Sequence, residues 1–266
     1  RGKRYTPESL TLTADWTGNQ TRRVRLEEIT DPTVGNVLGM EFVAVESGSF
    51  PMGSNDGYSD EKPVHTVRIT RPFWIGKFEV TQAEYEKLTG KNPSRFKGAR
   101  NPVEQVSWYD AKAFCEKLTE RERRAGRLPD GYEYRLPTEA EWEYCCRAGS
   151  DSAYCFGDDV SRLKDYANYE DTPTYGDERT APVGKFRRNA WGIHDMHGNV
   201  WEWCLDHWHD SYNGAPADGS AWTTGGNSSL RVLRGGSWFN ISSHCRSADR
   251  DFSDPEGTSI GGGFRV

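Results

Sequence analysis

The chain has 266 residues, with 40 acidic and 34 basic side chains and a formal net charge of −6. This length suffices for one large domain with a sizeable core. The weakly acidic balance argues against nucleic-acid phosphate or an anionic lipid surface as the main partner. No run of about 18 apolar residues occurs, so the sequence predicts no transmembrane helix. The 10 Trp, 12 Tyr, 11 Phe and 28 Gly predict an aromatic-rich core with many loops.

Residues 1–36 are interpreted as an N-terminal extension, and residues 37–266 as one domain without an internal boundary or repeat. Short alternating segments at 10–13 and 24–26 favour strands within the extension. In the domain, apolar residues alternate in three segments as is typical of strands. These are Gly39–Gly53, which we expect to form a hairpin, His65–Ile69 and Phe73–Val80.

Three helices are predicted by the same local signal, a hydroxyl residue followed three positions later by an acid. In such a capping box the hydroxyl accepts a free backbone N–H, and the acid accepts the N–H of the capping residue. Gly126 and Gly149 are expected to end the second and third helices. The three pairs are Thr81 with Glu84, Ser107 with Asp110, and Thr138 with Glu141.

The C-terminal stretch alternates between two kinds of sequence. Arg234–Trp238, Cys245–Ala248 and Gly263–Val266 combine glycine, large aromatics and arginine, and we interpret them as fixed structural blocks. We expect Arg234–Trp238 and Gly263–Val266 to be the last strands of the fold. The residues between these blocks have neither helical nor strand periodicity, which predicts exposed segments free of packing constraints. These segments are Phe239–His244, Asp249, Asp251–Asp254 and Gly257–Gly262.

Several motifs, in this order along the chain, resemble those of the formylglycine-generating enzyme (sulfatase-modifying factor) superfamily from about residue 37 to 266. Arg135–Tyr144 and Gly198–Trp203 form a very specific pair. The resemblance implies an α+β, C-type-lectin-like fold with low regular secondary structure, short antiparallel strands, a few helices and long loops. The other motifs are Phe50–Gly53, Glu79–Thr81, Pro102–Val103, Val106–Ala111, Arg234–Trp238 and Gly263–Arg265.

The enzymes of this superfamily have a cysteine pair just after a Gly-Gly-Ser-aromatic motif. The pair binds copper, because soft thiolates select Cu(I), and oxidises a substrate cysteine. Here Trp238 is followed by Phe239–His244, and the next cysteine is Cys245, in a segment similar to the family's later structural Cys-Arg segment. A single cysteine cannot form the pair, so we expect no oxidase activity of this type and a buried, structural Cys245.

Two pairs of histidines could suggest iron, because a second enzymatic relative, the sulfoxide synthases of ergothioneine assembly, uses three histidines. The pairs are His194 with His197 and His207 with His209. They lie around the structural Gly198–Trp203 motif, and we interpret them as loop residues. The six cysteines contain no C-x-x-C pair, which argues against a zinc site or a disulfide scaffold.

The C-terminal stretch also resembles the variable region of spirochaetal diversity-generating retroelement proteins. In that family, template Asn codons become NNY codons, which cannot encode Lys, Glu, Gln, Met or Trp. Those five residues make up roughly a fifth of ordinary composition. None of them occurs in the patternless segments, and Glu256, between two of these segments, is the exception in the region. Loops also favour Ser, Asp, Asn and Gly for conformational reasons.

The resemblance implies a non-enzymatic binding protein at the cell surface, held by a lipid anchor, with the variable region 234–266 as its ligand site. Phe239, Ile241, Phe252 and Ile260 are the expected apolar anchors. The expected ligand is a protein or other macromolecule, because exposed loops form shallow sites, and the chain is expected to be a monomer. The predicted contact residues are Phe239, Asn240, Ile241, Ser243, His244, Asp249, Asp251, Phe252, Ser253, Asp254, Thr258, Ser259 and Ile260.

Calcium is a further implication of the resemblance, because family members bind it with the loop around Gly-Asn-x-Trp-Glu. Transferred to this sequence, the ligands are the Asp195 and Glu202 carboxylates and the Gly198 and Val200 carbonyls. Hard oxygen ligands of this kind suit Ca²⁺.

Two alternative functions stay open from the sequence. The first is a formylglycine-generating oxidase acting on a peptide cysteine, which the missing cysteine partner disfavours. The second is a calcium-dependent carbohydrate-binding lectin, although the Glu-Pro-Asn and Gln-Pro-Asp sugar motifs of true C-type lectins are absent.

Overall fold

The computed structural model describes residues 36–172 and 179–266. Residues 1–35 of the N-terminal extension, with its two expected strands, therefore lie outside the described residues. Within these ranges the fold is α+β, with three α-helices, three small sheets and long connecting loops, as expected. No helix among the described residues is long and apolar enough to cross a bilayer.

The first four strands form a bent ribbon. β1 (Phe42–Val45) pairs antiparallel with β4 (Phe73–Gly76), and β2 (Gly48–Met52) pairs antiparallel with β3 (His65–Ile69). The expected hairpin within Gly39–Gly53 is therefore wrong, because both of its halves lie on the same arm of the ribbon. The chain reverses instead through the polar residues 53–64, which include the short 3-10 helix η2 (Ser59–Glu61).

The three predicted helices are confirmed, together with their capping boxes. α1 (Gln82–Thr89), α2 (Trp108–Arg124) and α3 (Glu139–Arg147) begin directly after the predicted capping residues. At α1, for example, the Thr81 N–H donates to Glu84 at 2.8 Å and the Glu84 N–H donates to the Thr81 hydroxyl at 3.3 Å. Local hydrogen bonding alone therefore fixes where each helix starts.

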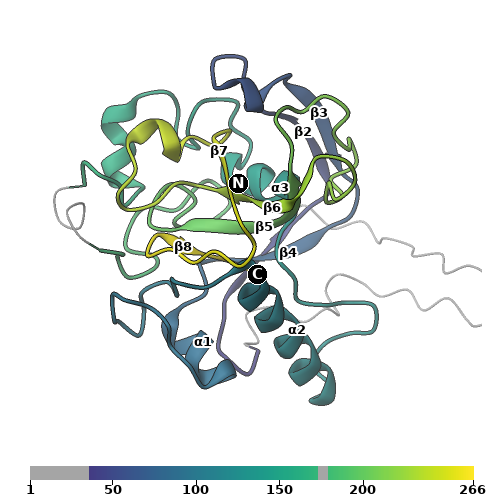
Figure 1. The fold of residues 1–266 in the computed structure, drawn as a ribbon, viewed down its shortest axis with the longest axis vertical. Coiled ribbons are helices and arrows are strands. Elements are labelled where there is room, and N and C mark those ends of the chain that lie inside the picture. Colours follow the sequence, from purple (N-terminus) through teal and green to yellow (C-terminus); the bar gives the residue numbers. More distant parts are fainter. Residues whose placement is uncertain (1–35, 173–178) are drawn as a thin grey trace, which may run out of the picture.

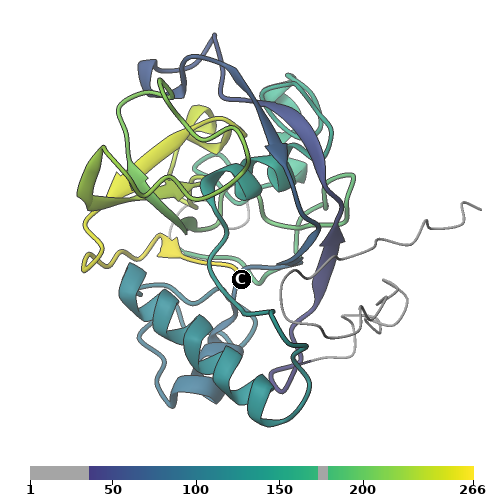
Figure 2. The same ribbon diagram turned by 90° about the vertical axis from the view of Figure 1, so that its right-hand side faces the viewer.

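A four-stranded sheet lies at the centre of the molecule, with α1 and α2 together below it in Figure 1. Its strand order is β7-β6-β5-β8, and only the β5–β8 pairing is parallel. In Figure 2, the yellow C-terminal strands lie on the opposite side of the molecule from the purple strand β1. The bounds are Trp201–Trp208 for β5, Asn227–Arg234 for β6, Arg250–Ser253 for β7 and Gly262–Gly263 for β8.

The strands expected at Arg234–Trp238 and Gly263–Val266 are wrong beyond the first residue of each block. β6 ends at Arg234, because Gly235 and Gly236 adopt φ values of 98° and 76°. This left-handed region is open to glycine and disfavours other residues. The chain turns there into a buried loop that carries Trp238. Two short 3-10 helices complete the fold, η3 (Val160–Asp165) and η4 (Ser242–Cys245).

The core is aromatic, as the composition predicts. The rings of Phe264 and Phe114 meet edge to face at 5.3 Å, and Tyr85 stacks on Phe114 at 5.5 Å. Trp142 is fully buried, and its indole N–H donates to Glu202 at 2.8 Å. These contacts fix the C-terminal Gly263–Val266 block between the helices and the central sheet.

Candidate functional site

Three buried ion pairs hold the C-terminal frame. The Arg234 guanidinium is fully buried and pairs with Glu143 of α3. Arg250 pairs with Glu139 of the same helix at 2.6 Å. Arg265 pairs with Glu202 of β5 at 2.5 Å. Each arginine comes from the C-terminal stretch and each acid from another element, so the frame is anchored to α3 and β5.

Such buried pairs make the frame intolerant of change. Removing one partner of a buried pair leaves an uncompensated charge, at a cost of about 3–5 kcal/mol. Arg250 adds contacts with the rings of Tyr212 at 4.2 Å and Trp208 at 4.6 Å. Arg234 lies 5.3 Å from the Trp142 ring centre. The frame therefore combines charge pairing with aromatic packing.

The segments between the frame blocks expose large apolar side chains, as predicted. Phe239 is 42% exposed, Ile241 52% and Phe252 44%. Among the described residues, only three other large apolar side chains are as exposed, namely Tyr58, Tyr109 and Val160. A concentration of exposed apolar side chains on one short stretch is typical of an interaction site.

The exposed phenylalanine rings pack against buried tryptophan rings. The Phe239 ring lies edge to face against Trp238, with ring centres 4.9 Å apart. Phe252 of β7 lies 4.6 Å from the ring of Trp208. One side of the Phe239 and Phe252 rings is therefore held by packing, and the other side is free to contact a ligand. This arrangement reduces the entropy lost when a ligand binds.

The remaining predicted contact residues fall into three groups. The structure places four of them on the surface, five in half-buried positions and one in the interior. The exposed four are Asp251, Asp254, Thr258 and Ser259, and the half-buried five are Asn240, Ser243, His244, Ser253 and Ile260.

Asp249 is the buried one, and its predicted role as a surface contact is wrong. Its side chain is fully buried, with carboxylate oxygens 3.3 Å from His244 Nδ1 and 3.3 Å from Arg246 Nη2. Burial raises the pKa of Asp249 to about 7. The residue directly precedes β7, where the chain enters the sheet, and its carboxylate holds the His244 ring in place.

A residue outside the variable region also belongs to this surface. Tyr58, in the polar reversal of the ribbon, is 50% exposed and stacks on His244 with ring centres 6.1 Å apart. Arg246 holds this loop through Glu61, at 2.6 and 2.8 Å. Burial favours a higher pKa for Glu61, but the hydrogen bonds from Arg246 and the Tyr58 N–H outweigh it and lower the pKa. No sequence signal pairs residues 58 and 244, because this contact is long-range.

The structure contains no thiol pair behind Gly-Gly-Ser-Trp. Cys245 is fully buried, as predicted, and burial raises the pKa of its thiol. Its carbonyl lies 2.7 Å from His197 Nδ1. All six cysteines are free, and only Cys155 is not fully buried. A buried, protonated thiol is a poor nucleophile and metal ligand.

The four predicted calcium ligands offer hard oxygen donors, but both carboxylates among them, Asp195 and Glu202, already accept hydrogen bonds. Three buried carboxylates, Glu79, Asp195 and Glu202, interact there with one cation, Arg265. Burial raises the pKa of Asp195 to about 6, although the N–H of Gly184 and the charge of Arg265 lower it. Both Glu202 oxygens, however, accept hydrogen bonds from Arg265 at 2.6 and 2.5 Å. A calcium ion bound by Asp195, Gly198, Val200 and Glu202 would have to share Glu202 with that guanidinium.

The histidine pairs make separate local contacts. His194 Nδ1 lies 2.9 Å from the Phe186 carbonyl, whereas His197 Nδ1 contacts Cys245. His209 stacks on Trp222 with ring centres 3.4 Å apart. Within residues 36–172 and 179–266, no three His, Cys, Asp or Glu side chains are arranged to hold a metal ion.

A family model described as "Sulfatase-modifying factor enzyme 1-like domain" matches residues 31–266. The formylglycine-generating enzyme of Streptomyces coelicolor is 32% identical, over 84% of this chain and 87% of its own length. Among solved structures, PvdO from Pseudomonas aeruginosa superposes with a TM-score of 0.74 at 36% identity, covering 84% of this chain and 92% of its own.

Variable protein 1 from Treponema denticola superposes almost as well. Its TM-score is 0.72 at 31% identity, over 84% of this chain and 93% of its own. The chain is therefore similar in sequence to a formylglycine-generating enzyme and in structure to a protein named for its variability.

Proposed function

The chain belongs to the family of sulfatase-modifying factor enzyme 1-like domains, and we propose that it is a non-enzymatic, surface-displayed member that binds ligands through a diversified C-terminal region. The observation that carries this proposal is the separation of two kinds of residue. Arg234, Arg250 and Arg265 are buried in ion pairs, whereas Phe239, Ile241 and Phe252 are about half exposed.

This separation suits a binding site that changes its side chains and keeps its fold. Surface substitutions away from buried networks usually alter stability by less than about 0.5 kcal/mol. Apolar area removed from water on binding contributes roughly 25 cal/mol per Å², so exposed aromatic anchors can supply affinity for a ligand. A fixed frame with aromatic anchors and small polar neighbours is also how antibody paratopes are built.

The ligand that fits best is a protein or other macromolecule on another cell. Phe239, Ile241 and Phe252 are exposed, and none of them lines either of the two hollows around Arg188 and His209. Asp251 and Asp254 are exposed beside Phe252, so a partner patch with apolar and basic groups complements this one.

The proposal is tested with a library in which codons 239–244, 251–254 and 257–260 are randomised as NNY. Gly261 and Gly262 are kept, because both are buried and a Cβ at Gly261 would lie 2.5 Å from the Phe239 ring. We expect most members to fold, as measured by protease resistance on a display platform, and selection against a folded target to yield specific binders. A matched library at positions 234–238 should lose most folded members, because it disrupts the buried frame. Equal loss of folding in both libraries would overturn the proposal.

The formylglycine-generating activity of the similar Streptomyces coelicolor enzyme is the second candidate function, favoured by 32% identity. It is tested by incubating the protein with copper, oxygen and a Cys-x-Pro-x-Arg peptide, with the Streptomyces enzyme as positive control. We expect no aldehyde, because no thiol pair follows Trp238. Aldehyde formation above that of a boiled control would contradict the non-enzymatic assignment.

Calcium at the Asp195 loop is part of the same proposal, as a structural ion. It would offset the surplus of buried carboxylates around Arg265. We expect the melting temperature to rise with Ca²⁺ and to return after EDTA, with Mg²⁺ as the control for ionic strength. An unchanged melting temperature would show that Arg265 alone compensates the buried carboxylates, without a calcium ion.

A further inference from the structure

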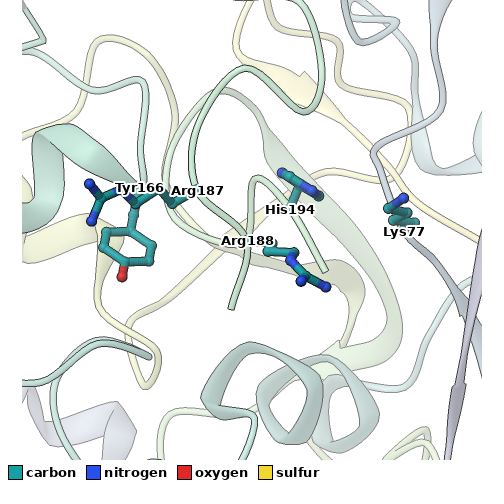
Figure 3. Close-up of a pocket in the computed structure, with 5 residues that line it drawn as sticks. All are labelled: Lys77, Tyr166, Arg187, Arg188 and His194. Carbon is teal, nitrogen blue, oxygen red and sulfur yellow. The ribbon is translucent and has the colours of Figure 1, made fainter. Parts of the chain in front are cut away.

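A hollow that is separate from the variable region lies where three loops meet (Figure 3). Its volume is about 460 Å³, and its lining is basic although the chain as a whole is acidic. No residue of the 234–266 region lines it. The lining residues are Lys77, Tyr166, Arg187, Arg188 and His194.

We propose that this hollow binds the phosphate or sulfate group of a small molecule. Lys77, Arg187 and Arg188 place three permanent cations around it. Arginine forks and a lysine ammonium are the side chains best suited to oxyanions with several acceptor oxygens. The volume falls within the range of small-molecule sites, about 300–1,000 Å³, and leaves room for the body of the molecule beyond its anionic group.

Arg188 is the central cation, and the surrounding fold holds it in place. Among the described residues it has no carboxylate within ion-pair distance, whereas Lys77 contacts Glu41 at 2.8 Å and Arg187 contacts Asp165 at 3.6 Å. Both of those pairs are exposed to solvent, where an ion pair contributes little to stability. Ligand oxygens can therefore replace the two carboxylates at little cost.

The turn that follows Arg188 is rigid. The Asn189 side chain accepts from the N–H groups of Trp191 at 3.0 Å and Ile193 at 3.1 Å. Gly192 has a φ of 92°, and a Cβ there would lie 3.2 Å from Arg188 Nη1. The guanidinium thus packs over a glycine that leaves space for it, so Arg188 and His194 are presented from the two ends of one fixed turn.

One uncharged donor, the Tyr166 hydroxyl, completes the hollow, whereas burial lowers the pKa of His194 and its ring forms a neutral part of the wall. The neutral His194 ring donates from Nδ1 to the Phe186 carbonyl at 2.9 Å and is packed on Phe78, with ring centres 5.1 Å apart. The Tyr166 ring stacks on Phe156 at 4.3 Å, and its hydroxyl lies 3.4 Å from Arg162. The hydroxyl can turn toward a ligand without moving the ring.

The experiment is calorimetric titration of the full chain with inorganic phosphate and with sulfate, at constant ionic strength in chloride. We expect saturable 1:1 binding, and Arg188→Gln should weaken it at least about tenfold, because a charge-assisted hydrogen bond is lost. Arg71→Gln is the matched control, since Arg71 is exposed and outside the hollow. Absence of saturable binding, or equal binding by the Arg188→Gln variant, would overturn the proposal.

Two further experiments identify the kind of ligand that carries the anionic group. Glucose 6-phosphate should bind at least as tightly as inorganic phosphate, and glucose should not bind. Sedimentation with phosphatidylcholine vesicles, with and without phosphatidic acid, separates a small molecule from a lipid headgroup. Sedimentation that depends on phosphatidic acid and is lost in Arg188→Gln would overturn the small-molecule assignment.

Discussion

Asp249 shows how burial changes the role of a single residue in the C-terminal stretch. Burial raises its pKa to about 7, while the facing charges of His244, Arg246 and Arg234 lower it and that of Glu61 raises it. The folded state therefore binds a proton more tightly than the unfolded state. The stability from this group is present at low pH and is lost as pH rises through about 7.

The variant Asp249→Asn removes this dependence. We expect its melting temperature, relative to the parent protein, to be higher at pH 8 than at pH 5, since a raised pKa corresponds to about 1.4 kcal/mol per unit. Scanning fluorimetry across this pH range measures the difference. A relative melting temperature that is constant with pH would show that Asp249 titrates normally.

The exposed and buried phenylalanines give a second prediction at this scale. Phe252→Ser should lower the free energy of unfolding by less than about 1 kcal/mol, because the ring is 44% exposed. Phe264→Ala should cost about 3–5 kcal/mol, because the ring is fully buried. Urea denaturation of both variants makes the comparison, and similar losses would contradict the distinction between frame and display residues.

At the scale of elements, the loop of residues 53–64 depends on one residue of the C-terminal stretch. Arg246 pairs with the buried Glu61, and Tyr58 of the same loop stacks on His244. Replacing Arg246 with Met should increase hydrogen exchange at the amides of 54–62, because the Glu61 carboxylate loses its counter-charge. Arg71→Gln serves as the control, and unchanged exchange would show that the loop is held by other contacts.

Elements that depend on local signals were predictable, and those that depend on pairing were not. The capping residues Thr81, Ser107 and Thr138 correctly fixed the starts of all three helices. The hairpin expected within Gly39–Gly53 failed, because strand partners are chosen by contacts across the ribbon. For the same reason the sequence could not place Tyr58 next to His244.

At the scale of the whole molecule, the motifs that carry the family resemblance are largely partners of one another. Glu139 and Glu143 of the Arg135–Tyr144 motif pair with Arg250 and Arg234, and Glu202 pairs with Arg265. The motifs were visible in the sequence, but their pairing required the fold. The exposed anchors were predictable because the segments between the motifs lack periodicity. The burial of Asp249 and the basic hollow around Arg188 were not, since both arise from contacts distant in sequence.

The proposed division into a fixed frame and a diversified surface is tested most directly by sequencing the 3′ end of this gene in many sister isolates. We expect substitutions confined to NNY codons within positions 239–262, with Arg234–Trp238 and Gly263–Val266 unchanged. A segment 239–262 that is invariant among isolates, or one that varies no more than the rest of the gene, would contradict diversification of the binding surface.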